Sequence, residues 1–340
     1  MGSVGDLALP HAKRTEGFAA LMLVVACACW GTFFSLAKNW QEAANETCPG
    51  GPLVGSLTLL GIRPILALTV FALVRPRLFL QPTRQEWLLG AGLGLLNFSG
   101  NVFQVWGLST ASPAVSGFFT SMASLWVPVI ALVVLRTPIA RATWLGLGLG
   151  VAGLAALGID TSQGFGLGQG EVLTALSSLI FAAVILCLDR AGRRARSEHF
   201  TLGLIAVGGL PGLPLAAGIT ACQSEHRVWI DWLITMLSDW HLVRDVVLLT
   251  FFSTVIGTFL LSTFQPRVPA SRAALIYLCE PVFAAVISVL LGHDQVTQRL
   301  VIGGLLILGG NALAALPAWL GQRSRESGLI CPLPDHPRRD

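Results

Sequence analysis

Charge is scarce in this 340-residue chain: only 12% of its residues are Asp, Glu, Lys or Arg, whereas 54% are hydrophobic. A soluble globular protein carries about 25% charged residues, and the mean hydropathy of this chain is +0.71. The composition therefore excludes a soluble protein and leaves no room for a soluble domain. It predicts an integral membrane protein.

Lysine is also rare, because Lys13 and Lys38 are the only two, and neither precedes Ser or Thr. A Walker A loop needs a lysine directly before Ser or Thr, so this chain does not hydrolyse ATP by itself. The six histidines all fall in predicted loops or tails. This leaves no intramembrane Ser/His dyad, metal cluster or haem ligand pair. We therefore predict no enzyme activity, no catalytic residue, no metal site and no cofactor.

The seven cysteines are scattered along the chain without the spacing of a metal site. Most of them fall within apolar stretches, where a free cysteine behaves as a small hydrophobic residue. Cys48 and Cys222 are predicted to lie at the same face of the membrane. A disulfide between these two residues therefore stays open at the level of the sequence.

The apolar residues form ten stretches of about 20 residues, which is the helix length that crosses a bilayer core of about 30 Å. Residues 225–242 differ, because their tryptophans and aliphatic residues recur at helical spacing against Asp231, Thr235 and Asp239. This pattern predicts an amphipathic helix that lies in the membrane interface. The ten predicted spans are residues 18–37, 54–74, 87–108, 114–135, 143–159, 171–188, 201–221, 245–264, 272–291 and 300–320.

Lysine and arginine are distributed unevenly between the two sides of the predicted bundle, and this bias sets membrane orientation. With a cytoplasmic N-terminus, 17 of them face the cytoplasm and four (Lys38, Arg227, Arg244 and Arg299) face the outside. The net charge of +4 thus reflects orientation rather than binding of nucleic acid. We expect a multi-pass protein of the cell (inner) membrane with both termini cytoplasmic.

The two halves of the chain are similar, and five spans in each half would invert the second half relative to the first. Trp30 corresponds to Phe181, and Pro128 in the fourth span corresponds to Pro281 in the ninth. Gly146 and Gly153 likewise match Gly303 and Gly310, and each pair is separated by seven residues. Proline-interrupted spans at matching positions of inverted halves indicate a midplane site in a secondary transporter. The residues predicted to act as hinges or gates are Pro64, Pro128, Gly209, Pro211, Pro214 and Pro281.

Arg63 and Glu280 lie near the middles of their spans, each directly before a proline. An ionisable side chain at membrane depth is costly and is a functional candidate by default. We expect both residues to line a central cavity, where they either pair with each other or bind the opposite charges of a zwitterionic substrate. A static ion pair that joins the two spans is the structural alternative. The other residues predicted to line the cavity are Trp30, Asn97, Asn101, Gln104, Trp126 and Tyr277.

Several segments are similar to the two repeats of the drug/metabolite transporter superfamily of the EamA type, notably ACWGTFF in the first span and LCEPVFAAVISVLLGHDQVTQRLVIGGLLILGGNAL at the end of the second repeat. The resemblance covers about residues 18–320. It implies an all-α membrane protein with ten transmembrane helices in two inverted five-helix repeats, a central cavity, and export of small metabolites by alternating access. The chain departs from the pattern at Asp294, where the family usually has glutamate, and near Thr137 or Arg141, where the first repeat has no carboxylate.

These observations predict a cytoplasmic tail at residues 1–16, a first repeat at 17–160, a second repeat at 170–320 with the interface helix at 225–242, and a cytoplasmic tail at 321–340. The predicted function is export of a small amphipathic metabolite such as an amino acid across the lipid bilayer, by a monomer or homodimer. Coupling is to protons through Glu280 or is absent. A sugar-phosphate or nucleotide-sugar exchanger is an alternative that would need more cavity cations than Arg63. A non-transporting membrane scaffold or sensor is an alternative of another class, and it would not need matched broken helices.

Overall fold

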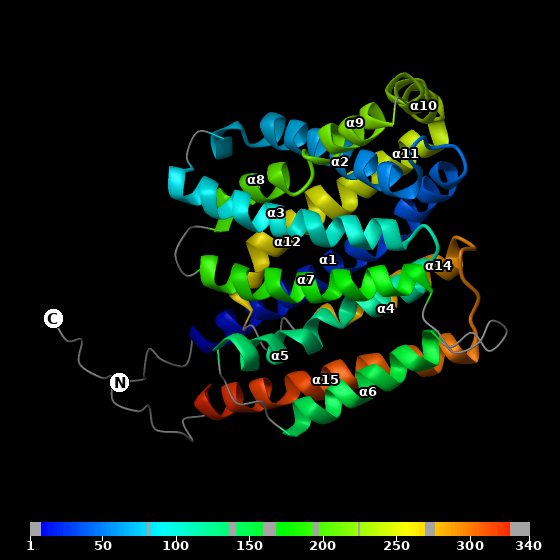
Figure 1. Cartoon of the computed structure of the whole chain (residues 1–340). Helices are drawn as coiled ribbons and strands as arrows, with labels where there is room; N and C mark the ends of the chain where they lie inside the picture. Colours follow the sequence, from blue (N-terminus) through cyan, green and yellow to red (C-terminus); the bar gives the residue numbers. More distant parts are fainter. Residues whose placement is uncertain are drawn as a thin grey trace.

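The computed structural model describes residues 8–79, 82–135, 141–158, 168–192, 197–223, 225–268 and 276–326. Within these ranges the chain forms helices joined by turns and contains no β-strand, which suits a bilayer because a helix satisfies its backbone hydrogen bonds internally. Figure 1 shows the helices side by side in one bundle. They are α1 (Ala8–Asn45), α2 (Gly51–Val74), η1 (Pro76–Phe79), α3 (Arg84–Gly107), α4 (Pro113–Ser121), α5 (Ala123–Leu135), α6 (Arg141–Gly158), α7 (Gln169–Gly192), α8 (Ser197–Val207), α9 (Gly212–Cys222), α10 (His226–Ser238), α11 (Trp240–Leu249), η2 (Thr250–Ile256), α12 (Gly257–Phe264), η3 (Gln265–Arg267), α14 (Cys279–Leu290) and α15 (Gln298–Glu326).

Six helical stretches of the described chain are long and apolar enough to cross a membrane, and three shorter apolar helices accompany them. Each of the ten predicted spans overlaps one described helix or two to three consecutive helical elements. The protein is therefore an all-α, multi-pass membrane protein, while the count of ten crossings stays a prediction. The six long stretches are Gly17–Asn45, Gly51–Val74, Arg84–Gly107, Gln169–Cys187, Thr201–Cys222 and Trp240–Leu261, and the shorter helices are Arg141–Leu157, Cys279–Leu290 and Gln298–Ala314.

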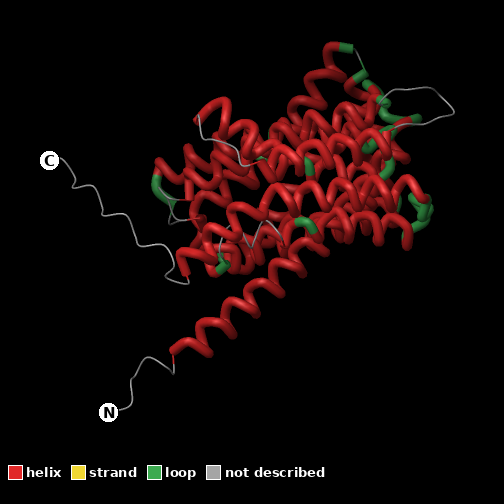
Figure 2. The backbone as a smooth tube through the Cα atoms, turned by 90° about the horizontal axis from the view of Figure 1, so that it is seen from below, coloured by secondary structure: helices red, strands yellow, loops and turns green. Residues whose placement is uncertain are grey.

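The first and last helices extend into the regions predicted as tails. α1 begins at Ala8 and α15 continues to Glu326, whereas residues 1–7 and 327–340 lie outside the described residues. The start of α1 and the end of α15 lie on the same side of the bundle, at the left of Figure 1. The first turns of α1 project beyond the other helices (Figure 2). Which side faces the cytoplasm stays a prediction.

Four of the predicted spans are interrupted. The break predicted in the seventh span is present at residues 208–211, between α8 and α9. In the fourth and ninth spans the sequence predicts interruptions at Pro128 and Pro281, but the turns lie at Met122 and Leu278, before these prolines. The sequence indicates no break in the eighth span. Met122 separates α4 from α5, a π-helical segment (η2) interrupts the eighth span, and a turn at Leu278 precedes α14. Irregular backbone at membrane depth is tolerated where it is buried in protein or lines a water-filled cavity.

A seam of glycines joins the antiparallel helices α6 and α15. A Cβ atom added at Gly146 would lie 2.4 Å from the carbonyl oxygen of Gly310, and one added at Gly153 would lie 2.7 Å from that of Gly303. Only residues without a side chain let two helix backbones approach so closely. Because Gly146 and Gly153 match Gly303 and Gly310 in sequence, exchanging the two halves converts each contact into the other. The α6–α15 pair therefore lies on an approximate two-fold axis.

A second contact occurs once in each half. Trp30 of α1 covers Gly257 of α12, where an added Cβ would lie 2.4 Å from the indole Nε1. Phe181 of α7 covers Gly100 of α3, where an added Cβ would lie 2.7 Å from the ring. Each of these two corresponding aromatic residues lies in the first span of its own half. Each covers a glycine on the third span of the other half. The two halves are similar in packing as well as in sequence.

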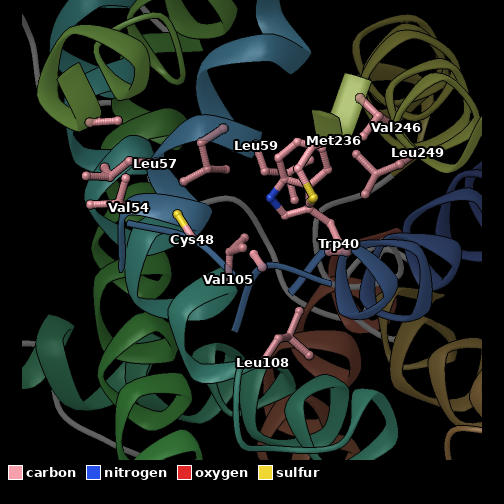
Figure 3. Packing of buried hydrophobic residues seen from close by; sticks show 14 of the residues in the cluster. Trp40, Cys48, Val54, Leu57, Leu59, Val105, Leu108, Met236, Val246 and Leu249 are labelled. Carbon is pink, nitrogen blue, oxygen red and sulfur yellow. The ribbon is translucent and has the colours of Figure 1, made fainter. Parts of the chain in front are cut away.

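The largest cluster of buried apolar residues lies where α1, α2, α3, α10 and α11 meet (Figure 3). Trp40 is at its centre with 1% of its surface exposed, and its ring meets Trp232 of α10 edge-on at 6.0 Å. Trp229 is also buried and donates from Nε1 to the hydroxyl of Thr58 at 3.2 Å. These contacts anchor α10 against the rest of the bundle.

The apolar residues of α10 divide between two faces, although the sequence pattern assigns them to one. Trp229 and Met236 are buried against the protein, whereas Ile230, Leu237 and the following Trp240 are exposed. The helix is therefore anchored by its inner tryptophans and offers its outer residues to the surroundings. Its location in the membrane interface stays a prediction.

Candidate substrate site

Arg63 reaches from α2 towards α1 and η2. Its Nη2 donates to the hydroxyl of Thr254 at 2.9 Å and is 3.5 Å from that of Ser253. Its guanidinium carbon lies 4.8 Å above the centre of the Phe33 ring, an arrangement in which the ring face attracts the cation. The Nε atom is buried and has no hydrogen-bond partner. The charge of Arg63 is thus held by two hydroxyls and a ring, while Nε donates to no acceptor.

The π-helical segment η2 explains why the backbone carbonyl of Ser253 can accept a hydrogen bond from a side chain. The backbone N–H of Gly257 donates to the carbonyl of Phe252, five residues earlier, instead of to that of Ser253. The Ser253 carbonyl thereby lacks its usual α-helical donor and accepts from the indole Nε1 of Trp30 at 3.2 Å. Ser253 therefore links Arg63 to Trp30. The Trp30 ring in turn lies 6.0 Å from the ring of Tyr277.

Glu280 lies in the first turn of α14, where the helix dipole favours a negative charge. Pro281 follows it inside that first turn, where the missing N–H leaves no helical carbonyl unpaired. The sequence suggests a mid-helix proline, and the turn at Leu278 makes this interpretation wrong. Glu280 is partly buried and lies within electrostatic range of Cys27 and Tyr277. The structure shows no ion pair between Glu280 and Arg63, and in the described chain each lacks a partner of opposite charge.

These residues form one polar and aromatic cluster, which we call the Arg63 site. It brings together one guanidinium, one carboxyl group, two hydroxyls and three aromatic rings. Within the described residues, no group of three or more His, Cys, Asp or Glu is placed to hold a metal. The members of the Arg63 site are Trp30, Phe33, Arg63, Ser253, Thr254, Tyr277 and Glu280.

Comparison with known proteins identifies the family. A sequence model described as the EamA-like transporter family matches residues 17–159 and again residues 168–316. The chain belongs to this family. The protein is therefore a membrane transporter of the drug/metabolite type and not an enzyme, and the two matches correspond to two repeats.

Solved structures support the same fold. Significant similarity is found for 17 chains. One of them, described only as the crystal structure of a protein, has 21% sequence identity and a TM-score of 0.56, over 90% of this chain and 99% of that chain. At this identity the likeness shows the fold alone. No curated protein sequence matches this member of the EamA-like family significantly.

The structure brings together three of the predicted cavity residues by direct contacts, namely Trp30, Tyr277 and, through Ser253, Arg63. Phe33, Ser253 and Thr254 were not recognised from the sequence. Ser253 and Thr254 are a polar pair inside an apolar span, and this is the only sequence signal that could have found them.

Asn97, Asn101, Gln104 and Trp126 have other partners. Gln104 donates from Nε2 to the hydroxyl of Thr120 at 2.9 Å, which ties α3 to α4, and Trp126 donates from Nε1 to the Ser178 hydroxyl at 3.1 Å, which ties α5 to α7. Asn101 donates to the carbonyl of Asn97 within α3. No described contact links these four residues to the Arg63 site. Their predicted role in the cavity of this EamA-like protein stays a proposal.

The predicted hinge at Gly209 lies against α2. A Cβ added there would lie 2.6 Å from the carbonyl oxygen of Leu60 and 2.8 Å from Cγ of Pro64. Replacing Gly209 by alanine would therefore force α8 and α9 away from α2, so this change does not test hinge stiffness alone. Pro211 precedes α9 directly and Pro214 lies in its first turn, while α2 continues through Pro64. Pro128 lies within α5, and its side chain is outside the described residues.

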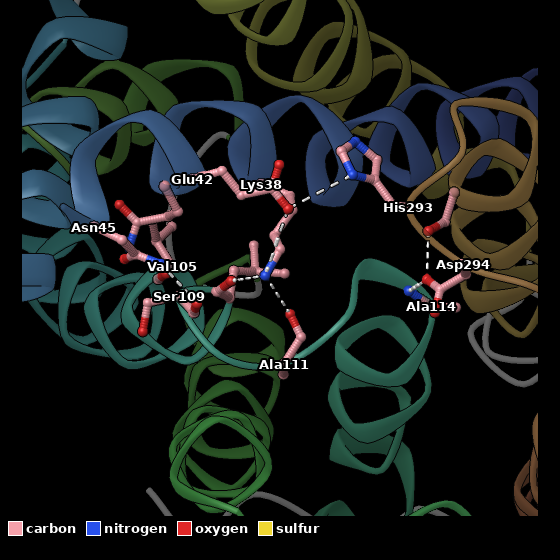
Figure 4. Close-up of polar contacts among 12 residues, drawn as sticks. Lys38, Glu42, Asn45, Val105, Ser109, Ala111, Ala114, His293 and Asp294 are labelled. Atoms are coloured by element: carbon pink, nitrogen blue, oxygen red, sulfur yellow. Dashed lines mark hydrogen bonds and ion pairs between the residues drawn. The ribbon is translucent and has the colours of Figure 1, made fainter.

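Polar side chains in the C-terminal part of α1 bind the end of α3 and the turn that follows it (Figure 4). Lys38 donates from Nζ to the carbonyl oxygens of Leu108 at 2.9 Å and Ala111 at 3.1 Å, and Asn45 donates to that of Ser109 at 2.8 Å. These three carbonyls belong to the C-cap of α3 and to the turn that follows it, so α1 supplies donors to backbone groups that no helix pairs. We call this set of contacts the α1–α3 clasp.

Asp294 lies at the same end of the molecule (Figure 4). Its carboxylate accepts from the backbone N–H of Ala114 at 3.0 Å and from the hydroxyl of Ser288. It thereby binds the N-terminal turn of α4, where an anion is favoured. The α14–α15 turn and the α3–α4 turn are thus held together at this end.

The six cysteines in the described ranges are free thiols, including Cys48 and Cys222. The disulfide left open by the sequence is therefore not formed. Cys48 lies in the turn after α1 and is buried, whereas Cys222 is exposed at the end of α9. Burial raises the pKa of the Cys48 thiol to about 12, because the thiolate would lose its hydration.

Proposed function

We propose that this EamA-like protein exports a small zwitterionic metabolite, an amino acid or a close relative, by alternating access. The observation that carries the proposal is the state of Arg63, whose guanidinium has no carboxylate partner among the described residues and whose Nε has no acceptor. An uncompensated charge at membrane depth is costly. A substrate carboxylate would supply the missing charge and accept hydrogen bonds from the guanidinium in a fork geometry.

Glu280 complements Arg63 in this proposal. It has no ion-pair partner among the described residues, so the static ion pair that would join α2 to α14 receives no support. A substrate ammonium group would neutralise Glu280 while the substrate carboxylate neutralises Arg63. The rings of Trp30, Phe33 and Tyr277 leave an apolar environment for the remainder of the substrate.

The test is transport into proteoliposomes with three matched solutes: a free amino acid, its carboxamide, and the corresponding acid without the amino group. The wild-type protein should prefer the free amino acid over both analogues. Arg63→Ala should abolish the preference over the carboxamide, because the substrate carboxylate then has no cationic partner in the protein. Glu280→Gln should instead abolish the preference over the acid without the amino group.

Arg77→Ala is the matched control, because Arg77 is an exposed arginine of η1, near the end of α2. It should retain both preferences. Arg63→Lys keeps the charge but not the fork and should recover part of the carboxylate preference. Each variant is first checked for membrane insertion and monodispersity in detergent. If folded Arg63→Ala still discriminates the free acid from the carboxamide as the wild type does, the proposal fails.

Direction is tested with cell-membrane vesicles of defined orientation. Inverted membrane vesicles should accumulate the amino acid if the protein exports it from cells. An imposed proton gradient separates coupling from exchange, because Glu280→Gln should stop gradient-driven accumulation and retain exchange if Glu280 carries the proton. Accumulation only in right-side-out vesicles would contradict export.

A further inference from the structure

A groove lies between α14 and α15, and none of the residues that line it belongs to the Arg63 site. It has a volume of about 470 Å³, within the range of about 300–1,000 Å³ typical of ligand pockets. α14 contributes Cys279, Val282 and Phe283, the turn before it contributes Leu278, and α15 contributes leucines and small residues that include Gly309. All of these side chains are apolar, so the groove offers nothing to bind a charge or a polar group.

The groove exists because its two helices pack against different partners. α14 lies mainly against α1 and α4, whereas α15 lies mainly against α6 along the glycine seam. Gly309 widens the gap further, because a Cβ added there would meet no atom within 4 Å. The described part of the chain therefore leaves this space open to the outside of the bundle.

The surroundings of the groove indicate what fills it. Val282, Val286 and Leu305, on both rims, are 41%, 50% and 64% exposed. In a multi-pass membrane protein such apolar side chains face the lipid, so the groove is continuous with the lipid-exposed surface. Gly309 is about 17 Å along α15 from its first residue, at a rise of 1.5 Å per residue. This depth lies within a hydrocarbon core of about 30 Å, where the available occupant is an acyl chain.

We propose that the groove binds one acyl chain of a membrane phospholipid. The bound chain lies against Cys279 and Phe283, on either side of Glu280, in the first turns of α14. Phe283 and Ala284 pack closely on Gly31, next to Trp30 of the Arg63 site: a Cβ added at Gly31 would lie 2.8 Å from the Phe283 Cβ and 2.9 Å from the Ala284 backbone nitrogen. The lipid chain thus supports the turn that carries Glu280, and transport depends on the chain that occupies the groove.

The experiment uses the full chain in vesicles of phosphatidylethanolamine and phosphatidylglycerol that contain a phospholipid with a photoreactive diazirine in one acyl chain. After illumination, the adducts are mapped by mass spectrometry. The test variant is Gly309→Leu, whose side chain fills the groove. The matched control is Gly148→Leu on α6, because Gly148 is also an exposed helical glycine whose added Cβ would meet no atom within 4 Å.

Adducts should concentrate on the groove residues of α14 and α15 in the wild type and in Gly148→Leu, and should fall to the level of other lipid-facing helices in Gly309→Leu. The transport rate should vary with acyl-chain length in the first two proteins and lose that dependence in Gly309→Leu. Adducts spread evenly over all lipid-facing helices would overturn the proposal. So would adducts displaced by amino acids, which would make the groove a substrate path, or cross-linked dimers that exclude lipid from it.

Discussion

Replacing Lys38 by methionine tests which contact holds the α1–α3 clasp together. The change removes the ammonium group and keeps a flexible apolar stem of similar length. Two backbone carbonyls, those of Leu108 and Ala111, then lose their hydrogen bonds from Lys38, whose side chain is only 12% exposed. A hydrogen bond from a charged group contributes about 1.5–3 kcal/mol. After allowance for the cost of ordering and desolvating a lysine, we expect a loss of about 2–4 kcal/mol in unfolding free energy.

The competing explanation is the ion pair between Lys38 and Glu42. Their charged atoms are 3.9 Å apart, and the Glu42 side chain is 54% exposed. Exposed ion pairs contribute about 0–1 kcal/mol, so Glu42→Gln should cost less than about 1 kcal/mol. The two substitutions therefore separate the carbonyl contacts from the ion pair.

The assay is reversible unfolding of the purified protein in mixed micelles with increasing SDS, followed by far-ultraviolet circular dichroism. Wild type, Lys38→Met and Glu42→Gln are compared under one set of conditions. Equal losses for the two variants would show that the ion pair dominates and would refute the reasoning. A loss below about 1 kcal/mol for Lys38→Met would show that the carbonyls find other donors, such as water.

Two further predictions follow from packing and burial. Gly257→Ala should lower the unfolding free energy by about 1–3 kcal/mol through overpacking, because its Cβ would lie 2.4 Å from Nε1 of Trp30; Gly218→Ala, where an added Cβ meets no atom within 4 Å, should cost nothing measurable in the same SDS titration. At pH 7 the Cys48 thiol should react slowly with a water-soluble maleimide in the folded protein, because its pKa of about 12 leaves it protonated and burial shields it. The exposed Cys222 should react readily, and rapid modification of Cys48 before unfolding would contradict the structure.

The class of the protein and the approximate positions of its helices follow from the sequence, because long apolar runs have one common outcome in a bilayer. The repeat was also recognisable, since paired glycines and aromatics in the two halves have equivalent packing roles, as at Gly146 and Gly303. The sequence marks the fourth and ninth spans by Pro128 and Pro281, but it did not reveal that the turns lie at Met122 and Leu278, because neither position has a glycine or proline. They depend on contacts between helices that are distant in sequence.

The partners of Arg63 illustrate the same limit. Serine and threonine in an apolar helix commonly bond a carbonyl of the preceding turn, and Thr58 and Thr250 do so here. A sequence cannot tell such hydroxyls from Ser253 and Thr254, which face Arg63 instead. The difference arises from the π-helical register of η2, which the apolar pattern of the eighth span does not reveal.

This register accounts for the geometry of the Arg63 site. One extra residue in a helical turn rotates everything beyond it by about 100°, since an α-helix has 3.6 residues per turn. Without the π segment, the backbone N–H of Gly257 would donate to the Ser253 carbonyl. This N–H would then compete with the indole N–H of Trp30 for the same acceptor. The same rotation would turn either the hydroxyls away from Arg63 or Gly257 away from the Trp30 ring. A single irregular turn therefore lets one helix contact Trp30 of α1 and Arg63 of α2, and Nε of Arg63 is left without an acceptor.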